Sequence, residues 1–154
     1  MIKEHGSKRL GGGWIPLAAL ALLALVAPAA AADDPLSLTF DDVSFDIKQN
    51  QPYESSMLTD KIKQYNGKTI RIKGFLAPSF KQSGLTDFVL MRNTECKFGS
   101  GDPVCHFIMV KMQGGKSIDF TVRPVSVEGE FRIDEFKIGK KVYAIYQMKG
   151  TSAE

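Results

Sequence analysis

Apolar and polar residues alternate with a period of two along most of the second half of the chain, which predicts a mainly β protein. The clearest alternating run covers residues 125–133, and another covers residues 70–76. Gly129 lies at the centre of the longer run, where a glycine is typical of a sharp bend or a β-bulge. Each of these runs predicts a strand with one buried and one exposed face.

Shorter apolar runs add further strands. Residues 88–91 and 107–112 flank a loop rich in glycine and proline, and residues 142–148 form a last run with no clearly polar face. Residues 118–122 also alternate, and residues 134–141 read as a polar connection. Before the first strand, apolar residues at helical spacing over residues 55–65 predict one short helix, with Ser55 or Ser56 as its N-cap.

Five or six strands, each with one exposed face, are stable only if the sheet curls or gains a second layer. The strand spacing predicts a small OB-like five-stranded Greek-key barrel preceded by one short helix, with a small β-sandwich as the alternative. The expected organisation is a signal peptide over residues 1–32, an extended lead-in over 33–53, the barrel domain over 54–150 and a disordered tail over 151–154.

The leader has the features of an export signal. Lys3, Lys8 and Arg9 precede an apolar run that ends in three alanines, Ala30 to Ala32, which is the pattern of a cleaved secretory signal. An uncleaved membrane anchor is the alternative interpretation of the same run. Cleavage near Ala32 would deliver the domain to the periplasm or the cell envelope.

Charge narrows the range of partners. The leader holds three of the 20 Lys and Arg residues and one of the 17 acidic residues, so the remainder has 17 basic and 16 acidic residues and a net charge of about +1. A nucleic-acid-binding domain normally has a strongly basic face, so nucleic acid is not expected as a partner. The expected partner is an unknown protein or small ligand of the cell envelope, with membrane contact only through an uncleaved leader.

Site chemistry is concentrated in the loop between the two central apolar runs. This loop holds both cysteines of the chain, Cys96 and Cys105, followed at once by His106. Because export leads to an oxidising compartment, a Cys96–Cys105 disulfide across the mouth of a hairpin is the first prediction. A redox-active pair is disfavoured, because eight intervening residues are many for that chemistry.

A metal site is the alternative for the same residues. Cys96, Cys105 and His106 would supply two thiolates and an imidazole to Zn²⁺ or a copper ion, with Asp102 or Glu95 as a fourth ligand. The spacing matches no standard zinc pattern, and adjacent strand residues point to opposite faces, so the site would need an irregular strand end. No other cofactor is expected, and no catalytic residue is assigned.

Three segments resemble exported bacterial proteins of the domain-of-unknown-function 3299 type: Ile-Arg-Ile-Lys-Gly-Phe-Leu-Ala-Pro from Ile70, Asp-Phe-Val-Leu leading into Cys-Lys-Phe-Gly, and Val-Ser-Val-Glu-Gly-Glu-Phe from Val125. The resemblance covers roughly residues 68–133. It implies an exported barrel with a cysteine after the second strand and proline-containing sequence beyond it, which Cys96 and Pro103 match. Lys97 departs from what related loops carry beside that cysteine.

These observations together predict an exported, non-catalytic binding or accessory module of unknown ligand. The alternative is a periplasmic metal-binding accessory protein that uses Cys96, Cys105 and His106. In both cases the surface expected to matter is the loop over residues 93–106 and the strand ends beside it.

Overall fold

The structure is a computed structural model that describes residues 34–154, and the leader predicted over residues 1–32 lies outside them. Six strands form one mixed sheet: β1 (Leu36–Leu38), β2 (Thr69–Leu76), β3 (Asp87–Met91), β4 (Phe107–Met112), β5 (Val125–Ile138) and β6 (Lys141–Ala153). Helical structure in this part of the chain is limited to α1 (Asp60–Lys63) and the 3-10 turns η1 (Phe40–Val43), η2 (Ser55–Met57) and η3 (Val104–His106). No helix within residues 34–154 is long and apolar enough to cross a membrane.

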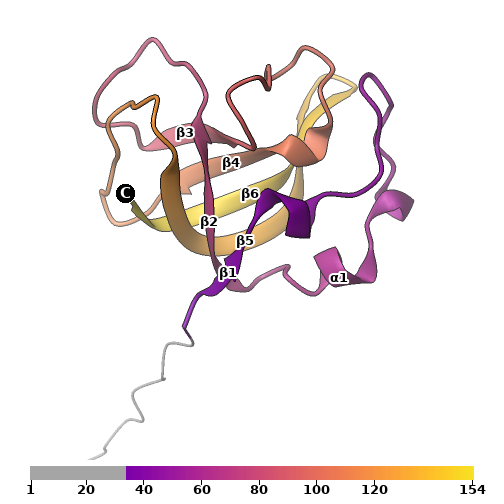
Figure 1. The fold of residues 1–154 in the computed structure, drawn as a ribbon, viewed down its shortest axis with the longest axis horizontal. Coiled ribbons are helices and arrows are strands. Elements are labelled where there is room, and N and C mark those ends of the chain that lie inside the picture. The colour runs from indigo at the N-terminus through magenta and orange to yellow at the C-terminus, as the bar shows by residue number, and fades with distance from the viewer. Residues whose placement is uncertain (1–33) are drawn as a thin grey trace, which may run out of the picture. The chain divides into compact units, whose positions relative to one another are not determined.

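The strands run in the order β1-β2-β3-β4-β6-β5, and β2 also pairs with β5. This last pairing is antiparallel over Thr69 to Gly74 and closes β2, β3, β4, β6 and β5 into a ring (Figure 1). β4 runs parallel to β6, whereas β2–β3, β3–β4 and β5–β6 are antiparallel. The mainly β fold class is therefore confirmed, and the ring of five strands is the arrangement that an OB-like fold requires.

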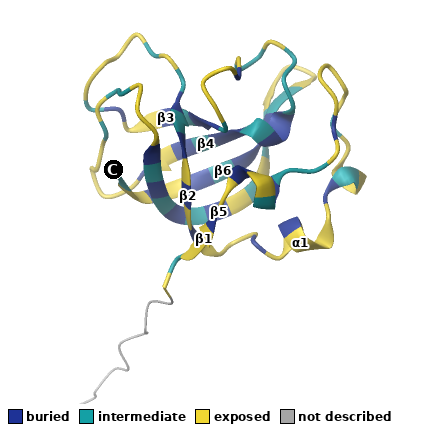
Figure 2. Cartoon of the chain, viewed as in Figure 1, coloured by how far each residue is buried: buried dark blue, intermediate teal, exposed yellow. Residues whose placement is uncertain are grey.

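The core lies inside the ring because the alternating residues point inward. The residues that are almost completely buried there include Ile70, Ile72, Val127, Phe131 and Tyr146. The outward residues of the same strands are mostly exposed or half-buried (Figure 2).

Glycine allows the backbones of neighbouring strands in the ring to lie close together. A Cβ at position 129 would overlap the backbone of β6, and the pairing register shifts beside Gly129, as expected of a bulge.

The described part of the predicted lead-in, residues 34–53, packs onto the domain instead of lying apart from it. β1 pairs with β2 in parallel, and Phe40 and Val43 of η1 belong to the main core. The Tyr146 hydroxyl donates a hydrogen bond of 2.5 Å to the Val43 carbonyl, which ties η1 to β6. The sequence predicts an extended segment here, because apolar residues alternate with acids and other polar residues.

Two sequence predictions for the segments between the main strands need correction. The helix expected over residues 55–65 is broken: Leu58 is extended, and the Thr59 side chain accepts a hydrogen bond from the Ile62 N–H, so that Thr59 caps a new, short α1. The strand expected over 118–122 is reduced to one bridge between Leu85 and Ile118. Val122 is 78% exposed, so the alternation there does not mark a buried face.

The C-terminal hairpin is also longer than predicted. Residues 134–138 belong to β5, and only Gly139, in the left-handed region, and Lys140 separate β5 from β6. Register shifts between Ile133 and Phe136 break the alternation, and the sequence pattern therefore read as a connection. Residues 151–153, assigned to a tail from the sequence, are the end of β6, where Ala153 pairs with Val127.

Candidate functional site

The loop after β3 and the η3 turn hold the three residues selected from the sequence, but they do not bring all three together. Cys96 packs outside the ring in a small cluster with Met91, Phe107 and Ala144. Cys105 is 1% exposed and belongs to the main core. The structure therefore assigns the two thiols to different apolar clusters.

The Cys96–Cys105 disulfide predicted from the sequence is not formed, and both cysteines are free thiols. Local hydrogen bonding explains the placement of Cys96. The Asn93 side-chain oxygen accepts the backbone N–H groups of Glu95 and Cys96, each at 3.0 Å, and folds the chain into a turn that directs Cys96 outward. The η3 turn directs Cys105 inward. Closeness in sequence thus gave no guide to the direction of the two side chains.

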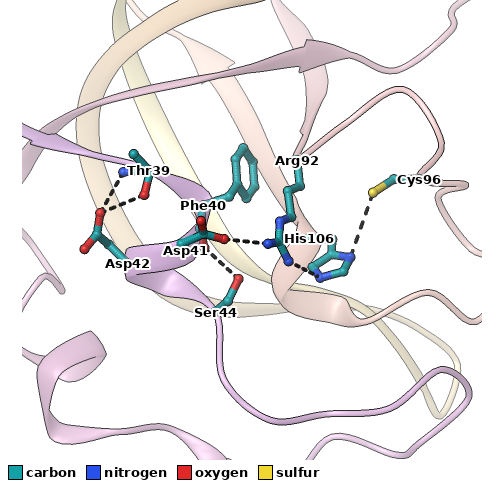
Figure 3. Close-up of polar contacts among 8 residues, drawn as sticks. All are labelled: Thr39, Phe40, Asp41, Asp42, Ser44, Arg92, Cys96 and His106. Carbon is teal, nitrogen blue, oxygen red and sulfur yellow. Dashed lines mark hydrogen bonds and ion pairs between the residues drawn. The ribbon is translucent and has the colours of Figure 1, made fainter.

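The predicted trio of metal ligands is not assembled either. Within residues 34–154, no group of three His, Cys, Asp or Glu side chains lies close enough to hold a metal ion. His106 does lie near Cys96, with 3.8 Å between Nδ1 and Sγ (Figure 3). The irregular backbone that such a contact needs is present as η3, which replaces the strand geometry at residues 104–106.

His106 and Cys96 belong to a longer chain of polar contacts (Figure 3). Asp41 of η1 pairs with the Arg92 guanidinium, and Arg92 Nη1 lies 3.2 Å from His106 Nε2. Because a guanidinium can only donate, Nε2 must accept, and the proton of a neutral imidazole is then on Nδ1, facing Cys96. The Cys96 thiol in turn donates to the Asn93 oxygen at 3.2 Å. This chain joins the lead-in, β3 and the loop.

The electrostatics of this pair oppose thiol activation. Burial raises the pKa of the Cys96 thiol, and burial together with the Arg92 charge lowers the pKa of His106. Both groups are therefore neutral near pH 7. A catalytic thiolate–imidazolium pair needs the opposite shifts. The arrangement is a neutral hydrogen-bonded pair and not a nucleophile with its base.

Beside Cys96 the surface holds an apolar groove of about 590 Å³. Its floor is the outer face of β2 and β3, where Phe75, Val89 and Met91 point away from the core. One wall is formed by residues 94–98 of the loop after β3, and the opposite wall by residues 120–122 of the loop after β4. The volume lies within the range of about 300–1,000 Å³ that is usual for ligand sites.

Sequence reasoning missed this groove and also the contacts of Arg92 and Asp41. A signal for the groove was present, because Phe75 and Val89 occupy outward strand positions where a solvent-facing side would carry polar residues. The Phe98 ring lies edge-on to Phe107, with 5.2 Å between the ring centroids, and helps to cover the outer face of the sheet.

The fold and groove define a small, mainly β protein with a closed ring of strands and an apolar outer face. The chain resembles the crystal structure of a DUF3299 family protein from Pseudomonas aeruginosa PAO1, with a TM-score of 0.58 and 18% sequence identity over 78% of this chain and 95% of that chain. The resemblance stated from the sequence is therefore confirmed at the level of the fold. No family model matches the sequence, and no curated protein matches it.

Proposed function

We propose that the protein is an exported, non-catalytic binding module of the cell envelope and that the groove beside Cys96 receives an apolar part of its ligand. The observation that carries this proposal is the groove itself. Its floor and walls present the half-buried aromatic rings of Phe75, Phe98 and Phe120 on the outside of a sheet whose core is already filled. Apolar concave surfaces of this kind are the usual seats of small ligands.

The strand pairing favours a ligand that places apolar groups in the groove over a peptide that adds a strand beside β3 or β4. β3 pairs with β2 and β4, and β4 pairs with β3 and β6, so both central strands have hydrogen-bonded neighbours on either side. An extended peptide that binds by strand addition needs a free sheet edge. The neutral state of Cys96 and His106 supports a binding role without chemistry of its own.

A hydrophobic fluorescent probe tests this function directly. N-phenyl-1-naphthylamine should bind the exported protein with increased emission, and Val122→Asp should weaken this binding several-fold, because it introduces a charge at the groove wall. Ile138→Asp is the matched control, since Ile138 is also β-branched and exposed but lies outside the groove. Equal binding by both variants and the wild type, or no binding at all, would remove the proposal.

Export is tested by the mass of the protein recovered from the producing cell. Cleavage near Ala32 predicts loss of the leader and a mature chain that begins close to Asp33. The full-length mass in the cytoplasmic fraction would contradict export while leaving the groove test valid.

A second candidate function, binding of a soft metal ion, is favoured by one observation. The 3.8 Å between Cys96 Sγ and His106 Nδ1 is close to the separation of two ligands on one ion, given Zn–S and Zn–N distances of about 2.3 and 2.0 Å. Only these two ligands come together, and Arg92 occupies the place where metal-binding histidines usually have a carboxylate or carbonyl partner. Zinc titration distinguishes the cases: a real site is lost in Cys96→Ser and kept in Cys105→Ser.

A further inference from the structure

The groove carries a single formal charge among its lining residues. Lys97 is exposed at the wall formed by the loop after β3, and the other lining groups are apolar apart from two threonine hydroxyls and the Cys96 thiol. Within residues 34–154 no carboxylate forms an ion pair with the Lys97 ammonium. Asp102 of the same loop accepts a hydrogen bond of 2.6 Å from the backbone N–H of Lys97. The groove therefore combines an apolar floor with one available cation.

This combination fits a particular kind of ligand. An apolar floor stabilises a hydrocarbon chain by removing it from water, in proportion to the apolar surface that is buried. The ammonium of Lys97 favours an anionic group at the end of such a chain, and no acidic side chain lines the groove to oppose it. A cationic group on the ligand would meet the Lys97 ammonium, with no carboxylate among the lining residues to offset the repulsion.

The loops at the mouth of the groove add a second, independent observation. Phe80, fully exposed, and Val122, 78% exposed, are followed directly by Lys81 and Arg123. The loops that carry them lie side by side at one end of the molecule and are mostly exposed (Figure 2). They are joined by the Leu85–Ile118 bridge, and the Phe120 N–H donates to the Gln82 carbonyl at 2.9 Å. Exposed apolar residues next to cations are typical of contacts with an anionic lipid surface.

We propose that the groove binds one acyl chain of an anionic amphiphile, with the carboxylate or phosphate of its head at Lys97. This inference rests on the proposed binding function and specifies its ligand class. The same chemistry is presented by a free fatty acid and by a membrane phospholipid. Phe80 distinguishes these sources, because it lies outside the groove and would contact a bilayer during uptake from a membrane, whereas a free fatty acid needs only the groove.

Displacement of the fluorescent probe from the exported protein tests the ligand class. Dodecanoate, dodecanol and dodecyltrimethylammonium share a chain length and differ in charge, so dodecanoate should displace the probe at the lowest concentration. Lys97→Glu should weaken dodecanoate binding by about tenfold and leave dodecanol nearly unchanged, since it replaces attraction with repulsion near the surface. Lys48→Glu is the matched control, because Lys48 is exposed and lies outside the groove.

The outcomes separate this inference from the function on which it depends. If the three amphiphiles bind equally, or if Lys97→Glu behaves as Lys48→Glu does, the anionic ligand class is wrong and the apolar binding function stands. If no amphiphile displaces a probe that binds, the acyl-chain inference falls alone. If the probe itself fails to bind, the proposed function falls with it.

A vesicle assay then identifies the source of the ligand. With vesicles of phosphatidylcholine and phosphatidylglycerol, the exported protein should co-float and remove labelled phosphatidylglycerol if the membrane is the source. Phe80→Ser should reduce both effects while leaving dodecanoate binding intact, because Phe80 does not line the groove. Dodecanoate binding without co-flotation assigns the site to free fatty acids. Co-flotation that Phe80→Ser does not reduce would overturn the role given to the loops.

Discussion

Replacing Tyr146 with phenylalanine tests whether the lead-in segment is an integral part of the domain. Tyr146 is completely buried on β6, and its hydroxyl donates a hydrogen bond of 2.5 Å to the Val43 carbonyl on η1. Tyr146→Phe keeps the ring and its packing on Phe131, at 4.9 Å between centroids, but leaves a buried carbonyl without its donor. Such an unpaired group costs about 1–3 kcal/mol of unfolding free energy.

For a domain of this size, a loss of about 1–3 kcal/mol lowers the melting temperature by roughly 3–12 °C. Circular dichroism melts and urea titrations of the two proteins measure it. Tyr143→Phe is the matched control, because it removes the same atom from a half-buried tyrosine whose hydroxyl has no hydrogen-bond partner within residues 34–154. If Tyr146→Phe melts with the wild type, or loses no more than Tyr143→Phe, the attachment of η1 through this bond is refuted.

The same residue predicts an alkaline dependence. Burial raises the pKa of Tyr146 above its ordinary value of 10.0, so the folded state keeps its phenol proton when the unfolded chain loses it. The unfolded state therefore binds fewer protons above pH 10, and stability falls as the pH rises beyond that point. Unfolding free energies measured from pH 8 to 11 should decline more steeply for the wild type than for Tyr146→Phe. Parallel curves would contradict the assignment.

Three further predictions concern the thiols, the lead-in turn and the sheet. Under native conditions Cys96 should react with a small thiol reagent much faster than Cys105, because Cys96 lines the groove and Cys105 lies in the core; equal rates in the two single-serine variants would contradict this placement. Hydrogen bonds from the Thr39 backbone and from Lys61 lower the pKa of Asp42 to about 2, so its stabilising contribution is present above about pH 4 and is lost as the pH falls towards 2. Acid titration of Asp42→Asn should therefore show a flatter decline of stability than the wild type, and an unchanged profile would rule the contribution out. Gly129→Ala should destabilise the domain by about 1–3 kcal/mol in urea unfolding, because the added Cβ would overlap the backbone of β6. The control is Gly114→Ala, whose Cβ meets open space, although Gly114 has a positive φ. An effect no larger than that of the control would refute the close approach of β5 and β6 at Gly129.

The alternation of apolar residues determined the strands that form the core. A period of two identified β2 and most of β5, and short apolar runs identified β3, β4 and the first part of β6. The helix was over-extended because the apolar spacing across residues 55–65 does not reveal that Thr59 restarts the turn. The end of β5 was missed because its residues are mostly polar and its pairing register shifts near Phe136.

The sequence by itself identified the loop over residues 93–106 as the place of interest, because it holds both cysteines and His106. Only the tertiary structure decided how that loop is placed. Backbone turns direct Cys96 and Cys105 into different clusters, and pairings between distant strands create a groove from residues of β2, β3 and two loops. The local pattern of apolar residues indicates which face of a strand a residue occupies. Which loops and strands lie next to one another, and so whether a groove forms between them, depends on how the whole sheet closes.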